Sequence, residues 1–317
     1  MPGSTQFFKN KCNFAVKLKT LLNSSFTFSK TRIAPTPSGF LHLGNILSFV
    51  ITSLIARKSN ALILLRVDDL DQARTDGKYL REIFDTLDFL EIPWNEGPLN
   101  AAEFETGYSQ LNRMELYKTA LMQLAADGKV FACGCSRKQL LQHGSCNCIN
   151  LEIPLTTENT AWRLITGNNH PLMVKTIKGE SVPFFLPSVM QHFIVKKKDG
   201  FPAYQLTSLM DDLFYGVDLV VRGQDLWPST LAQQELARAL GKNRFADIAF
   251  YHHPLLLTPD GAKLSKSAGA TSIKHLRENG KKPADIFTLI AAMLNINETP
   301  ANWQQLGEAF FNRIEPI

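Results

Sequence analysis

The sequence has no apolar run long enough to cross a membrane, and its first 30 residues contain no acid and no arginine. Those residues hold five of the 34 basic residues, so the 29 that remain equal the 29 acids, and the formal charge of +5 belongs to the N-terminal segment. Composition therefore gives no sign of a generally basic, nucleic-acid-binding surface. At 317 residues, 44% hydrophobic and 20% charged, the chain suffices for one large α/β unit with insertions or for two domains.

Residues 1–30 are poor in acids and carry phenylalanines and leucines among serine, threonine and lysine, which is typical of an organellar targeting segment. The absence of arginine argues against that interpretation. A dispensable extension, or a start codon assigned too far upstream, is the alternative. Both stay open, and we leave this segment out of the fold prediction.

Cysteines are few, and their placement is uneven. Cys12 lies in the N-terminal segment, while Cys133, Cys135, Cys146 and Cys148 fall within 16 positions. Two Cys-x-Cys pairs across a short, glycine-bearing knuckle are typical of a structural Zn²⁺ site with four thiolate ligands. Free or disulfide-bonded cysteines are the alternative, but the spacing does not suggest the disulfide framework of a secreted protein.

The stretch from Thr31 to Asn45 predicts a short strand, a turn with two prolines and a glycine, and then an apolar helix from Ile46 to Lys58. This order places His42, Gly44 and Asn45 at a helix N-terminus, which favours an anion such as a nucleotide triphosphate. His42 and Asn45 are expected to donate hydrogen bonds to phosphate oxygens, and Gly44 to let a base or ribose lie against the backbone. A simply packed histidine is the alternative.

Far along the chain, the polar stretch from Thr258 to Gly269 carries Lys263 and Lys266 between flanking glycines. Lysines on such a segment are mobile point charges that suit a cover over phosphate groups. A solvated basic loop is the alternative.

Two further strands end in charged residues. The apolar run Ala61 to Val67 leads into Asp68, Asp69 and Asp71, and the run Leu219 to Val221 leads into Arg222. Ligands of parallel sheets collect at the carboxyl ends of strands, so these side chains are candidates for binding. The alternatives are helix capping by Asp71 or Asp76 and an exposed Arg222 paired with Asp225.

Several blocks carry a family resemblance. His42-Leu43-Gly44-Asn45 and Lys263-Leu264-Ser265-Lys266-Ser267 resemble the HIGH and KMSKS signatures of class I aminoacyl-tRNA synthetases. The stretches Arg66 to Arg74, Tyr204 to Leu206 and Val221 to Leu226 resemble the glutamyl branch, most of all the short glutamyl-queuosine tRNA(Asp) synthetases.

The resemblance implies an α/β fold, with a Rossmann-type parallel sheet interrupted by an insertion that carries zinc and binds the acceptor end, and a small C-terminal helical segment. It divides the chain into residues 31–110 (first catalytic half), 111–190 (insertion), 191–271 (second catalytic half) and 272–317 (start of a stem-contact domain). Helices are expected at about 273–279 and 283–294, followed by a short tail, and Ser229-Thr230 is expected to cap the helix that runs to Leu240.

The resemblance also assigns roles to residues. His42, Asn45, Lys263 and Lys266 would be catalytic and, with Gly44, would bind ATP, with Mg²⁺ arriving on the nucleotide. Asp68, in place of the family glutamate, would hold the glutamate ammonium, and Thr36, in place of serine, keeps the hydroxyl. The whole expected glutamate pocket is Arg32, Thr36, Asp68, Tyr204 and Arg222. The family zinc site contains a tyrosine that this knuckle lacks, so Cys146 or Cys148 would replace it, with His143 as a further candidate.

The expected reaction is activation of L-glutamate without tRNA and its transfer to the queuosine base of tRNA(Asp), since the chain ends at Ile317, soon after the catalytic region. A truncated glutamyl-tRNA(Glu) ligase, a small-molecule nucleotidylyltransferase and a non-catalytic RNA-binding paralogue are the alternatives. We expect a cytoplasmic monomer with no DNA or membrane partner.

Overall fold

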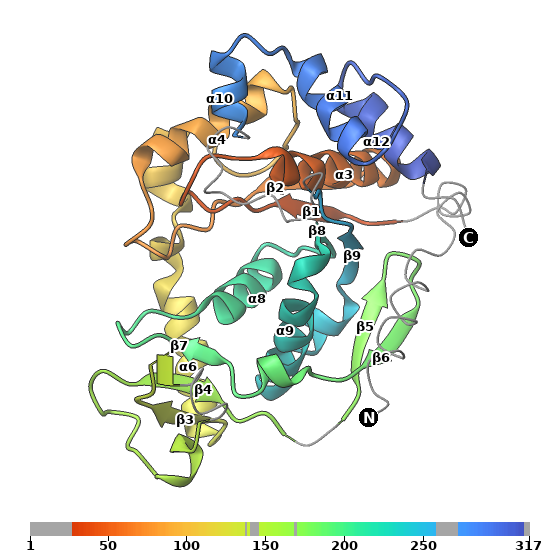
Figure 1. The fold of residues 1–317 in the computed structure, drawn as a ribbon. Coiled ribbons are helices and arrows are strands. Elements are labelled where there is room, and N and C mark those ends of the chain that lie inside the picture. The colour runs from red at the N-terminus through yellow and green to blue at the C-terminus, as the bar shows by residue number, and fades with distance from the viewer. Residues whose placement is uncertain (1–26, 137, 140–145, 168–169, 258–271, 314–317) are drawn as a thin grey trace. The chain divides into compact units, whose positions relative to one another are not determined.

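The computed structural model describes residues 27–136, 138–139, 146–167, 170–257 and 272–313. The described chain forms two compact units (Figure 1). The first contains the residues up to Tyr108 and those from His253 onward, and the second contains Ser109–His252. No helix in the described ranges is both long and apolar enough to cross a membrane.

The first unit is built on a parallel strand pair joined by a helix. β1 (Lys30–Ile33) pairs in parallel with β2 (Leu62–Leu65), with Thr31 opposite Ile63, and α3 (Leu43–Ser59) connects them. Each strand is buried at three of its four positions, as expected for parallel strands covered by helices. β2 is wholly apolar, whereas β1 buries the polar Thr31 and Arg32 beside Ile33. Lys30 is already part of β1 and forms an ion pair with Glu96 at 2.7 Å.

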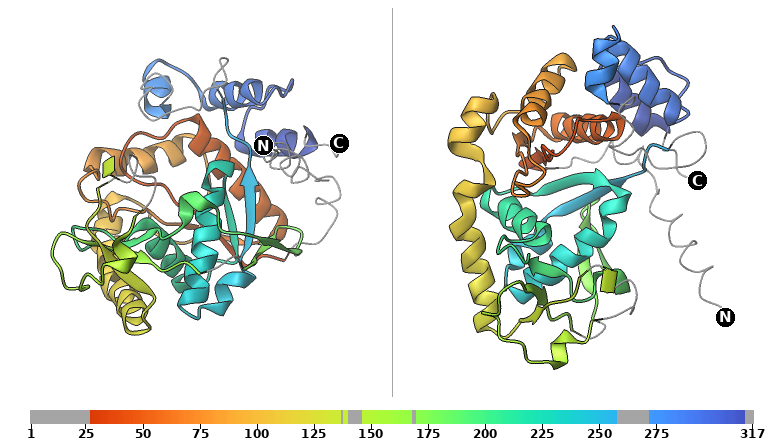
Figure 2. Two further views of the ribbon diagram at one scale, coloured as in Figure 1. Left: turned by 60° about the horizontal axis from the view of Figure 1, so that its bottom comes forward. Right: turned by 60° about the vertical axis from the view of Figure 1, so that its left-hand side comes forward.

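Helices complete this unit. They are α4 (Gly77–Phe89), α5 (Ala101–Glu103), the π-helical turn η2 (Phe104–Tyr108), α10 (Ile273–Glu278), α11 (Pro283–Met293) and α12 (Trp303–Arg313). α11 and α12 lie side by side (Figure 2). α12 also packs on α3, where a Cβ on Gly307 would lie 3.0 Å from Leu54. The short tail predicted after residue 294 is wrong, since α12 occupies it.

The second unit contains two groups of strands. β3 (Val130–Cys133), β4 (Ala161–Leu164) and β7 (Ile194–Lys196) form an antiparallel sheet. A second group follows the order β8 (Leu219–Gly223), β9 (Ala249–His253), β5 (Leu172–Thr176) and β6 (Ser181–Phe184). β5 runs parallel to β9 and antiparallel to β6.

The helices of the second unit are α6 (Met114–Ala126), α8 (Tyr204–Phe214) and α9 (Trp227–Ala239), with short turns η3 (Gln110–Arg113), η4 (Cys148–Asn150), η5 (Ser188–Met190), η6 (Gln224–Leu226) and η7 (Asn243–Asp247). α9 begins at Trp227, with Pro228 in its first turn. The predicted cap at Ser229-Thr230 is therefore wrong, because both residues lie inside the helix.

The predicted α/β class with parallel strands is confirmed by the pairing of β1 with β2 and of β5 with β9. The helix predicted from Ile46 in fact begins at Leu43, so His42 itself is the N-cap residue. The N-cap is the position from which a side chain meets the first free backbone N–H groups of a helix.

Candidate active site

His42 and Asn45 form a reciprocal cap at the start of α3. The Gly44 N–H donates to His42 Nδ1 at 3.1 Å, and the His42 N–H donates to Asn45 Oδ1 at 3.1 Å. Because Nδ1 accepts a proton donor, Nε2 is the protonated nitrogen of the neutral imidazole ring. The Asn45 oxygen is likewise engaged, so its Nδ2 amide is the donating end. The cap thus fixes both side chains at the first turn of α3.

Gly44 is required here for a reason that the sequence did not reveal. A Cβ at this position would lie 3.0 Å from His42 Cε1 and 3.1 Å from Nδ1. The glycine therefore lets the His42 ring fold back over the first turn and accept the Gly44 N–H. The sequence interpretation placed a base or ribose against this backbone, but the described neighbour of Gly44 is the imidazole.

The segment after β1 runs beside the segment after β2. Backbone hydrogen bonds connect Arg66 N to Ile33 O and Asp68 N to Pro35 O, each at 2.9 Å. Pro35, which accepts from Asp68, is followed directly by the half-buried Thr36. Arg32 lies buried on β1 itself. Three of the five predicted glutamate-binding residues therefore lie in the first unit.

Asp68 has a partner that the sequence interpretation missed. Arg66 donates from Nε to Asp68 Oδ1 at 2.7 Å and from Nη2 to Oδ2 at 3.0 Å, and both side chains are largely buried. Such a two-pronged contact fixes the plane of the carboxylate. The signal was present in the sequence, because Arg66 stands two residues before Asp68, where a strand alternation places both on one face.

The polar segment around Asp69 also has a capping role. Asp76 is the N-cap of α4 and accepts from the Lys78 N–H at 2.9 Å, which confirms one alternative for these acids. Asp71 is paired with Arg74 at the surface. Asp68, which is buried against Arg66, is neither a helix cap nor part of a surface ion pair.

Arg222 and Tyr204 belong to the second unit. Arg222 is the next-to-last residue of β8 and is 4% exposed, so the alternative of a surface arginine is wrong. Its Nη2 donates to Thr230 Oγ1 at 2.5 Å and to Gln233 Oε1 at 2.9 Å, and its guanidinium lies 5.4 Å from the centre of the Phe250 ring. Tyr204 is the first residue of α8 and is 44% exposed.

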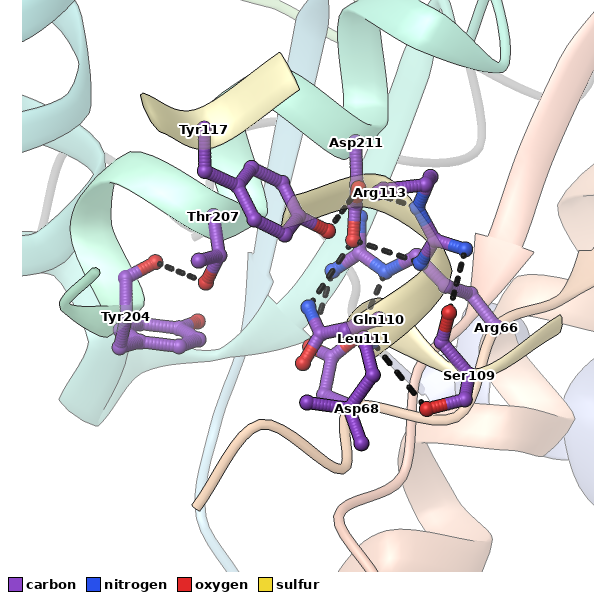
Figure 3. A network of polar contacts seen from close by, with 10 residues as sticks. All are labelled: Arg66, Asp68, Ser109, Gln110, Leu111, Arg113, Tyr117, Tyr204, Thr207 and Asp211. Atoms are coloured by element: carbon purple, nitrogen blue, oxygen red, sulfur yellow. Dashed lines mark hydrogen bonds and ion pairs between the residues drawn. The ribbon is translucent and has the colours of Figure 1, made fainter. Parts of the chain in front are cut away.

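Asp211 is the centre of a buried network that the sequence did not predict. Figure 3 shows Gln110, Arg113 and Tyr117 around its carboxylate. Arg113 donates from Nε at 2.8 Å and Nη2 at 3.1 Å, Tyr117 from its hydroxyl at 2.6 Å, and Gln110 from Nε2 at 2.9 Å. Burial acts against the charged form of Arg113, but Asp211 outweighs it and raises the pKa of Arg113. Burial, followed by the charge of Asp211, raises the pKa of Tyr117.

Lys263 and Lys266 lie outside the described residues. The chain is described again from Ser272, six residues after Lys266. There Ser272 forms an antiparallel bridge with His42, and the Ile273 N–H donates to Leu41 O at 2.8 Å. Ser272, the first described residue after these lysines, therefore lies beside the His42 cap.

The four cysteines meet in the second unit. Their Sγ atoms all lie within 4.8 Å of one another, with Cys133 to Cys146 at 3.4 Å, Cys135 to Cys146 at 3.8 Å and Cys135 to Cys148 at 3.5 Å. Thiolates bound tetrahedrally to Zn²⁺ at about 2.3 Å would be about 3.8 Å apart. The cysteines are free of disulfides, and the donor set fits zinc. His143, the further candidate ligand, lies outside the described residues.

Two cationic side chains, those of Arg163 and Lys198, lie next to the four cysteines. Burial disfavours the Cys133 thiolate, but hydrogen bonding from Arg163 and from neighbouring groups lowers the pKa of Cys133 to about 7. Burial raises the pKa of Cys146 to about 12. Lys198 Nζ donates to the carbonyl of Gly134, between Cys133 and Cys135, at 2.6 Å. Two cations therefore adjoin a cluster that becomes negative once its thiols ionise.

Known proteins resemble this chain in both sequence and fold. The family model for tRNA synthetases class I (E and Q), catalytic domain, matches residues 29–152 and 163–306. A glutamyl-Q tRNA(Asp) synthetase from Symbiobacterium thermophilum is 35% identical over 287 residues, which are 85% of this chain and 87% of that protein. A glutamate–tRNA ligase from Nitrosococcus oceani is 32% identical over 84% of this chain, but over only 59% of its own length.

A solved structure shares the fold. The glutamate–tRNA synthetase from Elizabethkingia anophelis superimposes with a TM-score of 0.70 at 20% identity, covering 91% of this chain and 67% of that one. This likeness supports the α/β fold class expected from the sequence.

Proposed function

Because the chain belongs to the class I tRNA synthetases (E and Q), we propose that it activates L-glutamate with ATP and transfers the glutamyl group to tRNA. The observation that carries this proposal is the His42–Asn45 cap, which holds two side chains with donor groups at a helix N-terminus and is bridged by Ser272. A helix start with this chemistry favours phosphate groups.

The proposed first step needs no side-chain nucleophile. A glutamate α-carboxylate oxygen attacks the α-phosphorus of ATP, the new O–P bond forms, and the bond to the pyrophosphate oxygen breaks. His42 Nε2, Asn45 Nδ2, Lys263 and Lys266 would stabilise the charge that develops on the phosphate oxygens. Mg²⁺ would enter bound to ATP through phosphate oxygens.

The proposed glutamate contacts follow from charge. Arg32 and Arg222 would bind carboxylates, Asp68 the ammonium group, and Thr36 and Tyr204 would contribute hydroxyl groups. Arg66 supports the role of Asp68, because its two hydrogen bonds hold the carboxylate in one plane. Within this proposal, residues 31–110 and 191–271 form the catalytic halves, residues 111–190 the insertion, and residues 272–317 the start of a stem-contact domain.

For the RNA substrate we propose the queuosine base of tRNA(Asp). The relative from S. thermophilum supports this choice, because the match takes in 87% of that protein. The ligase from N. oceani, which is 32% identical, favours transfer to tRNA(Glu) as the second candidate.

The test has two stages. ATP–pyrophosphate exchange across the amino acids, without and with tRNA, should show exchange with glutamate in the absence of tRNA. Glutamyl transfer should then be compared on tRNA(Asp) with queuosine, tRNA(Asp) without it, and tRNA(Glu). Labelling of tRNA(Glu) at its 3′ end in preference to the modified tRNA(Asp) would support the second candidate. If no amino acid supported ATP–pyrophosphate exchange, with or without tRNA, both candidates would be refuted.

For the cysteine cluster we propose one structural Zn²⁺ held by Cys133, Cys135, Cys146 and Cys148. The ion would cross-link the two Cys-x-Cys pairs. Because four protein ligands fill its tetrahedral coordination, it would have a structural role. Metal analysis should give about one zinc per chain, and Cys133→Ser should lower the melting temperature, with Cys12→Ser as the control. Zinc-free protein with an unchanged melting temperature would refute the proposal.

A further inference from the structure

α10 is connected at its beginning to the His42 turn. Its N-cap, Ser272, accepts from the His275 N–H at 3.2 Å and bridges His42, while Ile273 donates to Leu41. Lys274 Nζ lies 5.8 Å from the centre of the Phe40 ring, two residues before His42. The position of α10 therefore affects the position of the backbone at the His42 turn.

α10 has little apolar anchorage of its own. It is six residues long, and its only fully buried residue is Ile273. A helix this short gains little from propensity or from its own hydrogen bonds, so its orientation depends on tertiary contacts.

The main polar contact of α10 is made with α4. Arg277 Nη2 donates to both carboxylate oxygens of Glu82, at 2.9 and 3.0 Å, and Arg277 Nη1 donates to the Asp85 carbonyl at 3.3 Å. Lys274 Nζ lies 3.7 Å from Glu82 and is bonded to Glu278 at 2.7 Å. The Glu82 side chain is 5% exposed, and Thr86 donates to it as well.

Because the Glu82 carboxylate is buried, its charge depends on the cations of Arg277 and Lys274. Burial raises the pKa of Glu82, and the charges of Arg277 and Lys274 act in the opposite direction. A buried ion whose partner is removed is far more costly than an exposed one, so Glu82 and Arg277 depend on each other.

We propose that Glu82 is a positioning residue for adenylate formation: by binding Arg277 and Lys274 it holds α10 on α4, and α10 in turn holds the backbone of the His42 turn. The proposal rests on the proposed function for its kinetic consequence, but its structural part stands on contacts within the first unit. When Glu82 is changed, the His42 side chain would still be present, but its position relative to the substrate phosphate would shift.

The test uses Glu82→Gln in the full chain, with Glu308→Gln as the matched control. Glu308 pairs with Lys58 at 2.9 Å and connects α12 to α3 in the same unit, away from α10. Both variants should be assayed by glutamate-dependent ATP–pyrophosphate exchange at saturating substrates, well below their melting temperatures, with rates expressed per active site.

Glu82→Gln should lower kcat at least about 10-fold while the KM for glutamate changes less than about 2-fold, because alignment of a transition-state donor affects rate more than substrate binding. Glu308→Gln should keep kcat within about 2-fold. Arg277→Met should match Glu82→Gln, and the double variant should be no worse than either, since the pair acts as a unit.

Hydrogen–deuterium exchange separates this inference from the proposed function. Glu82→Gln should speed exchange in residues 41–46 and 272–276, and Glu308→Gln should not, whether or not the wild type activates glutamate. Unchanged exchange in these segments, or a kcat equal to that of Glu308→Gln in an active enzyme, would overturn the inference. A wild-type protein that activates no amino acid would refute the proposed function. In that case the hydrogen–deuterium exchange result alone would decide whether Glu82 positions the His42 turn.

Discussion

Asp68 and Asp211 are both buried carboxylates held by the Nε and Nη2 groups of an arginine, yet their surroundings differ (Figure 3). The partner of Asp68 is two residues away in sequence, and its side chain is 11% exposed. Asp211 is fully buried, and its partners stand 94 to 101 positions away.

This difference separates a role in folding from a role in binding. The Asp211 carboxylate accepts four hydrogen bonds from three side chains on η3 and α6, which join these elements to α8. Asp68 is held mainly by a neighbour that fixes its direction. We therefore expect loss of Asp211 to reduce stability, and loss of Asp68 to reduce activity.

The largest effect is expected from Asp211→Asn. It leaves the charge of Arg113 buried without its counter-ion, which typically costs about 3–5 kcal/mol of unfolding free energy. Urea denaturation measures the loss, and Asp199→Asn is the control, because Asp199 pairs with Lys197 at the surface and should cost under about 1 kcal/mol. Equal losses in the two variants would contradict a structural role for the network.

Asp68→Asn should act chiefly on catalysis. Removing the charge proposed to hold the substrate ammonium should lower kcat/KM for glutamate about 100-fold, which corresponds to about 2.7 kcal/mol. Its unfolding free energy should fall by less than that of Asp211→Asn, because Arg66, which binds Asp68, is only two residues away in the chain and Asp68 joins no distant elements through it. Asp71→Asn, three residues on and paired with Arg74 at the surface, is the kinetic control. Full glutamate activation by Asp68→Asn would remove Asp68 from the proposed pocket.

Tyr117→Phe should give the smallest effect, about 1–2 kcal/mol, since it removes one hydrogen bond to a charged group. It also tests the raised pKa of Tyr117. Above pH 10 the unfolded chain loses this phenolic proton while the folded chain keeps it, so stability falls as pH rises. The variant should lose less stability than the wild type between pH 9.5 and 11, and identical slopes would contradict the shift.

The sequence predicted those features that depend on adjacent residues. The placement of His42 and Asn45 at a helix N-terminus, the strand after Asn60 and the paired cysteines are each defined within a few positions, where spacing fixes which groups can meet. It predicted the order of β1, α3 and β2 for the same reason. Its errors were also local: Ser229-Thr230 has the composition of a cap, but Pro228 favours an earlier start for α9, and a buried Thr230 bonded to Arg222 occupies the helix interior.

Only the tertiary structure decided which distant residues meet. Nothing around Glu82 or Arg277 reveals that they pair across 195 positions, and nothing around Asp211 identifies Arg113 and Tyr117 as its partners. A charged residue on an amphipathic helix has the same local pattern whether it faces solvent or an ion pair. Its burial depends on packing between elements, and this packing also determines the partner of Glu82 and hence the proposed support of the His42 turn.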